Sequence, residues 1–236
     1  SPDYSGKGPR RNPKDNYMTP GMQGFDQWFA SEYSLATWNP YKPENAHGKY
    51  DVRNLFWHNG ENIKDGQAAG LTGCTSRMVM DKAIPFIEGA VKADKPFLAV
   101  IWFHAAHAPV IGGPRYRAMY PDATEDEQHY FAVVTALDEQ VGRLRAKLRE
   151  LGAAENTMLF FCSDNGPEAN PGKVNRWQGS AAPFRGRKRS LYEGGVRVPG
   201  LLEWPAVIKR PRETDVPCVT SDYFPTIAAV LGYDID

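Results

Sequence analysis

The stretch TEDEQHYFAVVTALDEQVGRLRAKLRELG (residues 124–152), followed by NTMLFFCSDNG (residues 156–166), decides the fold. Thr124 and Glu127 have the spacing of a capping box, in which two residues bond each other's backbone at the start of a helix. Apolar residues then recur at steps of three and four until Gly152, which predicts an amphipathic helix that ends there. The second piece is predicted to be a buried strand that ends in polar residues.

A second apolar run, FLAVIWF (residues 97–103), precedes this helix. Its unbroken apolar character predicts a strand covered on both faces, as in a parallel sheet. Strand, helix and strand in this order predict a parallel pair joined by a crossover helix. With a helix over 76–91, a strand within 194–204 and a helix within 221–232, the fold class is α/β, a mainly parallel sheet with helices on both faces.

The remaining composition narrows the class of protein. Residues 1–75 are rich in Pro, Gly and Asn and are expected to form loops and short strands that pack on a core made by residues 76–236, in one domain overall. Lys and Arg number 28 and so do Asp and Glu, so no basic excess favours a nucleic acid as partner. No apolar run reaches the roughly 20 residues of a membrane span. Three widely spaced cysteines predict neither a disulfide framework nor a zinc site.

Polar side chains follow both predicted strands. One strand leads to His104 and His107, and the other to Asp164 and Asn165. Ligands of α/β sheets bind beyond the carboxyl ends of the strands, so the two groups are expected to share one site. Asp and Asn oxygens suit a hard cation such as calcium or magnesium, and histidines exchange protons near neutral pH. Asp-Asn-Gly is also an ordinary turn sequence, and a histidine at a strand end is also compatible with simple packing.

Five motifs in order resemble the sulfatases of the alkaline-phosphatase superfamily, a formylglycine-dependent, arylsulfatase-like family. They are GFDQWFASE (24–32), PFLAVIWFHAAHAP (96–109), FFCSDNGPE (160–168), GRKRSLYEGGVRVPGLLEWP (186–205) and SDYFPT (221–226). Because their order and approximate spacing agree over nearly the whole chain, the resemblance implies an alkaline-phosphatase-like fold and hydrolysis of a sulfate monoester with a divalent cation.

The resemblance implies roles for the matched positions. Asp164 and Asn165 would be ligands of the cation, which is calcium in most members, with magnesium as the alternative. Lys188 would contact the sulfate and offset charge that builds on its oxygens. His107 would give a proton to the leaving oxygen, and His104 would orient its neighbour.

The chain also departs from the family. Ala106 stands where most members have proline. Members make a formylglycine nucleophile from Cys or Ser in a Cys/Ser-x-Pro-x-Arg motif, and that motif is not found here; CTSR (74–77) lacks its proline and spacing. The chain is therefore expected to be an internal portion of a longer sulfatase, truncated at both ends, that binds metal weakly and does not turn over alone.

The loop of residues 169–187 is expected to border the pocket, with Trp177 stacking on a sugar ring and Arg176 meeting an anionic group; a surface loop with a partly packed Trp is an equal alternative. The substrate implied is a carbohydrate or small aryl sulfate ester. Two alternatives stay open: a phosphate or phosphonate ester hydrolase of the same superfamily, and a non-catalytic glycan-binding module. Family habit implies a periplasmic or extracellular location.

Overall fold

The computed structural model describes residues 18–31, 34–45, 56–66, 68–168 and 176–234. The chain divides into a first unit, residues 1–151 with 167–180, and a second unit, residues 152–166 with 181–236. Each unit is described by itself. The boundaries of these units differ from those of the expected segments 1–75 and 76–236, and the division into domains stays a prediction. Residues 169–175 of the loop expected to border the pocket lie outside the described residues.

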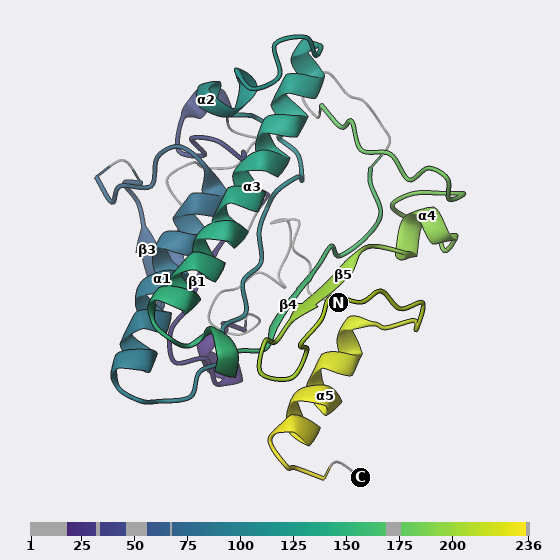
Figure 1. The fold of residues 1–236 in the computed structure, drawn as a ribbon. Coiled ribbons are helices and arrows are strands. Elements are labelled where there is room, and N and C mark those ends of the chain that lie inside the picture. The colour runs from purple at the N-terminus through teal and green to yellow at the C-terminus, as the bar shows by residue number, and fades with distance from the viewer. Residues whose placement is uncertain (1–17, 32–33, 46–55, 67, 169–175, 235–236) are drawn as a thin grey trace. The chain divides into compact units, whose positions relative to one another are not determined.

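Two long helices lie side by side in the first unit, α1 (Thr75–Lys92) and α3 (Glu125–Glu150) (Figure 1). The predicted capping box of α3 is confirmed: the Thr124 backbone N–H donates to Glu127 Oε2 at 2.9 Å, and the Glu127 N–H donates to Thr124 Oγ1 at 3.4 Å. Two N–H groups that a helix start leaves without intrahelical partners are thereby satisfied. The short helix α2 (Pro114–Arg117) packs against α3.

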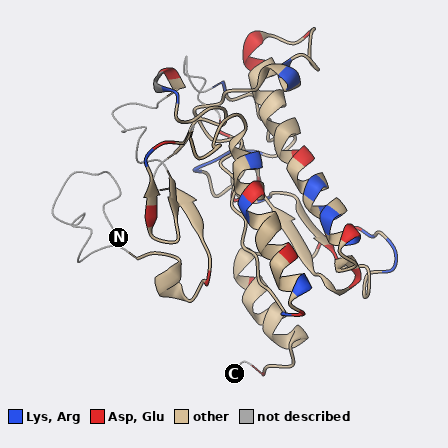
Figure 2. Cartoon of the chain, turned by 90° about the vertical axis from the view of Figure 1, so that its left-hand side faces the viewer, with Lys and Arg blue, Asp and Glu red and all other residues tan. Residues whose placement is uncertain are grey.

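Helix α1 confirms the helix predicted over residues 76–91, and it runs on through Pro85, which is exposed. Apolar residues of both helices are buried: Met78, Met80, Ile84 and Ile87 of α1, and Ala132, Val133, Ala136, Leu144 and Leu148 of α3. Ion pairs join the helices outside this core, Arg143 to Asp81 at 2.6 Å and Lys147 to Glu88 at 3.0 Å. Figure 2 shows that basic and acidic positions are interspersed along the long helices.

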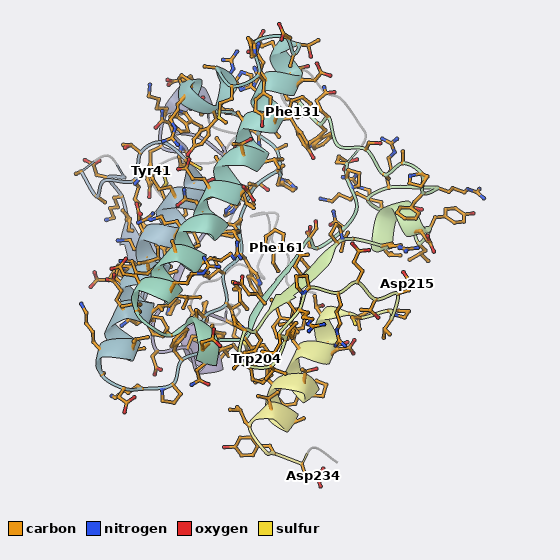
Figure 3. All side chains as sticks on the ribbon, in the orientation of Figure 1. Tyr41, Phe131, Phe161, Trp204, Asp215 and Asp234 are labelled. Atoms are coloured by element: carbon orange, nitrogen blue, oxygen red, sulfur yellow. The ribbon has the colours of Figure 1, made fainter. Side chains whose placement is uncertain are left out.

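The first unit also holds a small antiparallel sheet, in the order β1 (Phe29–Ser31), β2 (Phe56–His58), β3 (Glu61–Ile63). Asn59 and Gly60 connect β2 to β3 with φ of 50° and 92°, the backbone of a two-residue hairpin turn that matches the twist of the strands. The buried Phe56 ring stacks on Phe29 with centroids 4.5 Å apart. The hydroxyl of Tyr41, which is labelled in Figure 3, donates to the Ile63 carbonyl at 2.9 Å. Burial raises the pKa of Tyr41 to about 12.

The run of residues 97–103 is extended but is not part of a strand among the described residues, so the prediction of a doubly covered strand there is wrong. Leu98, Val100 and Trp102 are exposed, Trp102 by 84%, while the residues between them are half-buried. Side chains of an extended segment alternate between its two faces. Only one face of this segment is covered, and hydrophobicity alone does not supply the hydrogen-bonded neighbours that a strand needs.

The second unit holds β4 (Leu159–Cys162), paired antiparallel with β5 (Gly200–Glu203), and the helices α4 (Glu193–Val196) and α5 (Tyr223–Val230). Tyr223 joins α5 to β4: its ring stacks on Phe160 at 4.5 Å, and its hydroxyl donates to Cys162 Sγ at 3.2 Å. This hydrogen bond, helped by burial, raises the pKa of Tyr223 to about 12. Cys162 is half-buried, and all three cysteines are free.

Helices and small sheets of both units agree with the coarse α/β prediction. The mainly parallel sheet is not confirmed, because the paired strands of the described residues all run antiparallel. Short 3₁₀ turns complete the chain at Gly21–Gln23, Pro43–Asn45, Ala154–Asn156 and Thr220–Asp222. In the parts of the chain that the structure describes, none of the helices combines the length and apolar character needed to cross a membrane.

Candidate active site

The Asp164–Asn165 turn follows β4 directly. Ser163 Oγ donates to the Asn165 carbonyl at 2.9 Å, and Asn165 Nδ2 donates to the Gly166 carbonyl at 2.9 Å. The amide nitrogen of Asn165 is therefore used within the turn, which assigns its Oδ1 as the atom presented for a ligand. Asp164 is exposed and adds a carboxylate next to it. The turn offers two oxygen donors of different charge.

These two oxygens have the right chemistry for a hard divalent cation, but they are too few to enclose one. Calcium takes roughly six to eight oxygen ligands. Within the described ranges, no three His, Cys, Asp or Glu side chains gather as a metal-binding group. Asp164 and Asn165 thus fit one side of a calcium or magnesium shell and leave the rest to water or to other groups.

Glycines pack the Asp164–Asn165 turn tightly against the Glu-Gly-Gly segment of α4. The Gly166 N–H donates to the Gly195 carbonyl at 2.8 Å. A Cβ on Gly166 would lie 1.8 Å from the Gly194 carbonyl oxygen, so no side chain fits there. Both Gly166 and Gly194 are buried. Glycine is needed here because two backbones meet without a side chain between them.

The same glycines hold the loop that carries Lys188. The Gly194 N–H donates to the Arg185 carbonyl at 2.8 Å, and a Cβ on Gly195 would lie 2.1 Å from the Ser190 carbonyl oxygen. We call the three glycines of this contact, Gly166, Gly194 and Gly195, the glycine junction. It joins the loop of residues 185–190 to the Asp164–Asn165 turn, although these segments are about twenty residues apart in sequence.

Lys188 lies in a turn closed by the Ser190 N–H, which donates to the Arg187 carbonyl at 2.9 Å. Arg189, the next residue, has φ of 73°, a left-handed conformation that costs a non-glycine residue about 1 kcal/mol or more. Backbone strain of this kind is concentrated at functional sites, where surrounding structure holds it in place. The strained turn therefore favours a functional reading of the loop over a freely solvated basic loop.

Two other cations of this region are already engaged. The Arg185 guanidinium lies 4.0 Å from the Tyr192 ring centroid. Arg197 pairs with Glu193 at 3.2 Å and lies over the Phe184 ring. These contacts use Arg185 and Arg197 to brace the loop. Lys188 in the same loop is half-buried, and its contact with an anionic ligand stays a prediction.

The histidine turn of the first unit, residues 104–107, is closed by the His107 N–H, which donates to the His104 carbonyl at 2.6 Å. His104 Nε2 lies 3.1 Å from Ser31 Oγ at the end of β1, a contact that suits an orienting role. His107 is exposed, and its Nδ1 lies 2.8 Å from the Ala108 carbonyl oxygen. The peptide bond between Ala105 and Ala106 is cis.

Arg176 and Trp177, also in the first unit, are both half-buried. Arg176 Nη1 donates to the Val110 carbonyl at 3.2 Å, and Nε lies 3.3 Å from Asp126 Oδ1. Arg176 thus braces the segment after the histidine turn with part of its guanidinium. Recognition of a substrate by Arg176 and Trp177 stays a prediction.

The predicted site residues fall into two groups. In the second unit the glycine junction links the backbone of the Asp164–Asn165 turn to that of the loop that carries Lys188, and the first unit holds His104 and His107 with the Arg176–Trp177 pair. Sequence reasoning did not predict the glycine junction. Its signal was the presence of adjacent glycines between charged loops, since neighbouring glycines often mark a close approach of backbones.

Comparison of the chain with known proteins shows which family it belongs to. The Sulfatase family model matches residues 4–233. The chain belongs to the sulfatase family. The expected family resemblance is confirmed over nearly its whole length, and with it the alkaline-phosphatase-like fold at the coarse level.

Individual sulfatases agree with this assignment. Steryl-sulfatase of Rattus norvegicus is 36% identical over 149 residues, 60% of this chain and 24% of its own length. Arylsulfatase G of the same organism is 30% identical over 245 residues, 90% of this chain and 44% of its own length. The crystal structure of Ps i-CgsB in complex with k-i-k-neocarrahexaose superimposes with a TM-score of 0.78 at 25% identity, over 98% of this chain and 49% of that one. The sulfatase chain described here thus spans less than half the length of these relatives.

Proposed function

We propose that the protein is a sulfuric ester hydrolase that cleaves a sulfate monoester, and that these residues bind the sulfate and assist the leaving group. The observation that carries the proposal is the glycine junction. It holds an oxygen-bearing turn, Asp164–Asn165, next to a strained turn that carries Lys188. We propose that the acid and amide of the first turn hold a cation and that the lysine of the linked loop contacts a tetrahedral anion.

Each side chain has a role that follows from its chemistry. The Lys188 ammonium offers three donors and a compact charge, which oppose the negative charge that grows on the sulfate oxygens as the ester bond breaks. His107 donates its Nδ1 proton to the Ala108 carbonyl, so in the protonated imidazolium the second proton is on Nε2, which would give it to the bridging oxygen of the ester. Protonation of that oxygen makes the alcohol a better leaving group.

Asp164 and Asn165 would hold a divalent cation, calcium first and magnesium as the alternative. When bound, the cation supplies positive charge against the sulfate oxygens. The sulfatase family also uses a formylglycine nucleophile, and these 236 residues contain no Cys/Ser-x-Pro-x-Arg motif from which one is made. We therefore propose that turnover uses a nucleophile from outside these residues.

The substrate class proposed is a sulfate ester of a carbohydrate or an aryl compound. The support is that similar proteins include a steryl-sulfatase and a protein whose crystal structure was solved in complex with k-i-k-neocarrahexaose. Arg176 and Trp177 are proposed to contact the group that bears the sulfate. A periplasmic or extracellular location is proposed on family resemblance alone.

Hydrolysis by the natural gene product that carries these residues tests the function, with an aryl sulfate and the matching aryl phosphate compared in calcium. We expect preference for the sulfate. Lys188→Ala should lower kcat/KM by roughly 100- to 1,000-fold, the cost of removing one donor to a developing anion. The matched control Lys209→Ala removes an exposed lysine that donates to the Pro205 carbonyl, and should leave kcat/KM unchanged.

Two results would replace the proposal. Faster hydrolysis of the aryl phosphate would assign the chain to phosphate or phosphonate ester chemistry. Glycan binding without turnover, retained in both Asp164→Ala and Lys188→Ala, would instead identify a glycan-binding module.

A further inference from the structure

The orientation of the His107 imidazole depends on the backbone that follows it. Nδ1 lies 2.8 Å from the Ala108 carbonyl oxygen and 3.5 Å from Ser34 Oγ, so the carbonyl is the stronger partner. A carbonyl only accepts, which requires the proton on Nδ1 and leaves Nε2 for a substrate. Whatever fixes the carbonyl of Ala108 also fixes the direction of Nε2.

Thr37 holds the backbone immediately after Ala108. Its N–H donates to the Pro109 carbonyl at 3.2 Å, and its hydroxyl donates to the Ile111 carbonyl at 2.9 Å while accepting from the Ile111 N–H at 2.8 Å. A second approach of the hydroxyl to the Pro109 carbonyl, at 3.4 Å, is weaker because a hydroxyl has one proton. Thr37 is only 3% exposed.

Thr37 is itself anchored to the start of α1. Its carbonyl accepts from the Thr75 N–H at 3.1 Å and from the Thr75 hydroxyl at 3.2 Å. Thr75 is the first residue of α1, so its backbone N–H has no partner within the helix. A rigid helix, one buried threonine and the segment after His107 are therefore connected by an unbroken series of hydrogen bonds.

His129 of α3 holds the next residue. The Gly112 N–H donates to His129 Nδ1 at 2.9 Å, and His129 is 6% exposed. A Cβ on Gly112 would lie 2.6 Å from the Ala132 Cβ, so this backbone lies directly on the helix. Because Nδ1 accepts, His129 must be neutral with its proton on Nε2, which lies 3.8 Å from Glu125 Oε1.

We propose that Thr37 and His129 are positioning residues, which together hold residues 109–112 and so aim the Nε2 of His107 at the leaving oxygen. The chemistry of this inference rests on the proposed function. The hydrogen bonds that support it lie within the protein and involve no substrate. Arg176, which bonds the Val110 carbonyl between the two, completes the support. Thr37 and His129 approach residues 109–112 from separate elements, so their effects can be measured separately.

Paired variants of Thr37 in the natural gene product test the first contact. Thr37→Val keeps the shape but removes the hydroxyl, whereas Thr37→Ser keeps the hydroxyl. With an aryl sulfate, we expect Thr37→Val to lower kcat by roughly 100-fold, the effect of a displacement of about 1 Å, with KM changed less than about threefold. Thr37→Ser should stay within about threefold of wild type. The matched control Thr135→Val removes a hydroxyl that bonds the Phe131 carbonyl within α3, and should leave kcat unchanged.

Paired variants of His129 test the second contact. His129→Asn places an amide oxygen where Nδ1 accepts, and His129→Leu removes the acceptor. We expect kcat to fall in His129→Leu and to be restored within about fivefold in His129→Asn. If both variants of a pair lost the same fraction of kcat, the positioning role would be overturned. It would also be overturned if Thr135→Val lost as much kcat and as much thermal stability as Thr37→Val.

Amide hydrogen exchange separates this inference from the proposed function. In wild type the Ile111 and Gly112 amides should be protected, and protection should fall at least tenfold for Ile111 in Thr37→Val and for Gly112 in His129→Leu. If the wild-type protein showed this exchange pattern but did not hydrolyse sulfate esters, the proposed function would be overturned. The support of residues 109–112 by Thr37 and His129 would still stand. Unchanged exchange in both variants would overturn the inference itself.

Discussion

The glycine junction gives the sharpest prediction, through the substitution Gly166→Ala. The added Cβ would lie 1.8 Å from the Gly194 carbonyl oxygen, which is a backbone atom and cannot rotate aside. An ordinary carbon–oxygen contact is about 3.3 Å, so the two backbones must part by about 1.5 Å. That movement breaks the 2.8 Å hydrogen bond from the Gly166 N–H to Gly195.

The expected cost combines two effects. Overpacking costs roughly 1–3 kcal/mol, and the lost hydrogen bond about 1 kcal/mol. Together they lower the free energy of unfolding by about 2–4 kcal/mol, which for a chain of this size lowers Tm by roughly 4–16 °C. Since a shift of about 1 Å at a reacting group costs about 100-fold in rate, sulfate hydrolysis should fall by at least that factor.

Thermal unfolding and aryl sulfate hydrolysis of the natural gene product measure both effects. The matched control is Gly142→Ala, on the exposed face of α3, where an added Cβ meets nothing within 4 Å. It should raise stability by about 0.5–1 kcal/mol, because alanine is the better helix former. A Gly166→Ala protein with wild-type Tm and rate would refute the close approach of the two backbones.

Three further predictions concern the helix start, the buried histidine and the metal turn. Thr124→Ala should lower the free energy of unfolding by about 1 kcal/mol in urea denaturation, because the capping box of α3 is lost; an unchanged midpoint would contradict the cap. Burial, aided by Arg176 and Arg117, lowers the pKa of His129 from 6.5 to about 4. Between these values the unfolded chain binds a proton that the folded chain does not, so stability should fall as pH drops from about 6.5 to about 4, by on the order of 3 kcal/mol. Urea midpoints against pH should show this slope in wild type and a smaller one in His129→Asn. Finally, calorimetric titration of the 236-residue chain with calcium should give only weak binding, in the millimolar range, because Asp164 and Asn165 supply few of the roughly six to eight oxygens needed. The variant Asp164→Ala should lose this binding. Micromolar binding by the wild type would contradict the argument that the oxygen ligands are too few.

Local patterns made much of the fold predictable. The apolar period and the Thr124–Glu127 pair determined α3, and the same period determined α1 even through Pro85. The Asn59–Gly60 hairpin carried an equally clear local signal, since these residues adopt the positive φ that a two-residue turn requires. Pairing of strands was not predictable in this way, because the apolar run 97–103 encodes extended backbone but not the partner that would make it a strand.

The sequence by itself determined the family, the long helices and the residue types of the proposed site: Asp164, Asn165, Lys188 and the histidines. Tertiary structure alone decided what supports them, namely the glycine junction and the contacts of Thr37 and His129 with residues 109–112. The physical reason is distance along the chain. Helix periodicity and caps act between residues three or four apart, whereas Thr37 and Ile111 meet only because the path of the folded backbone brings them together.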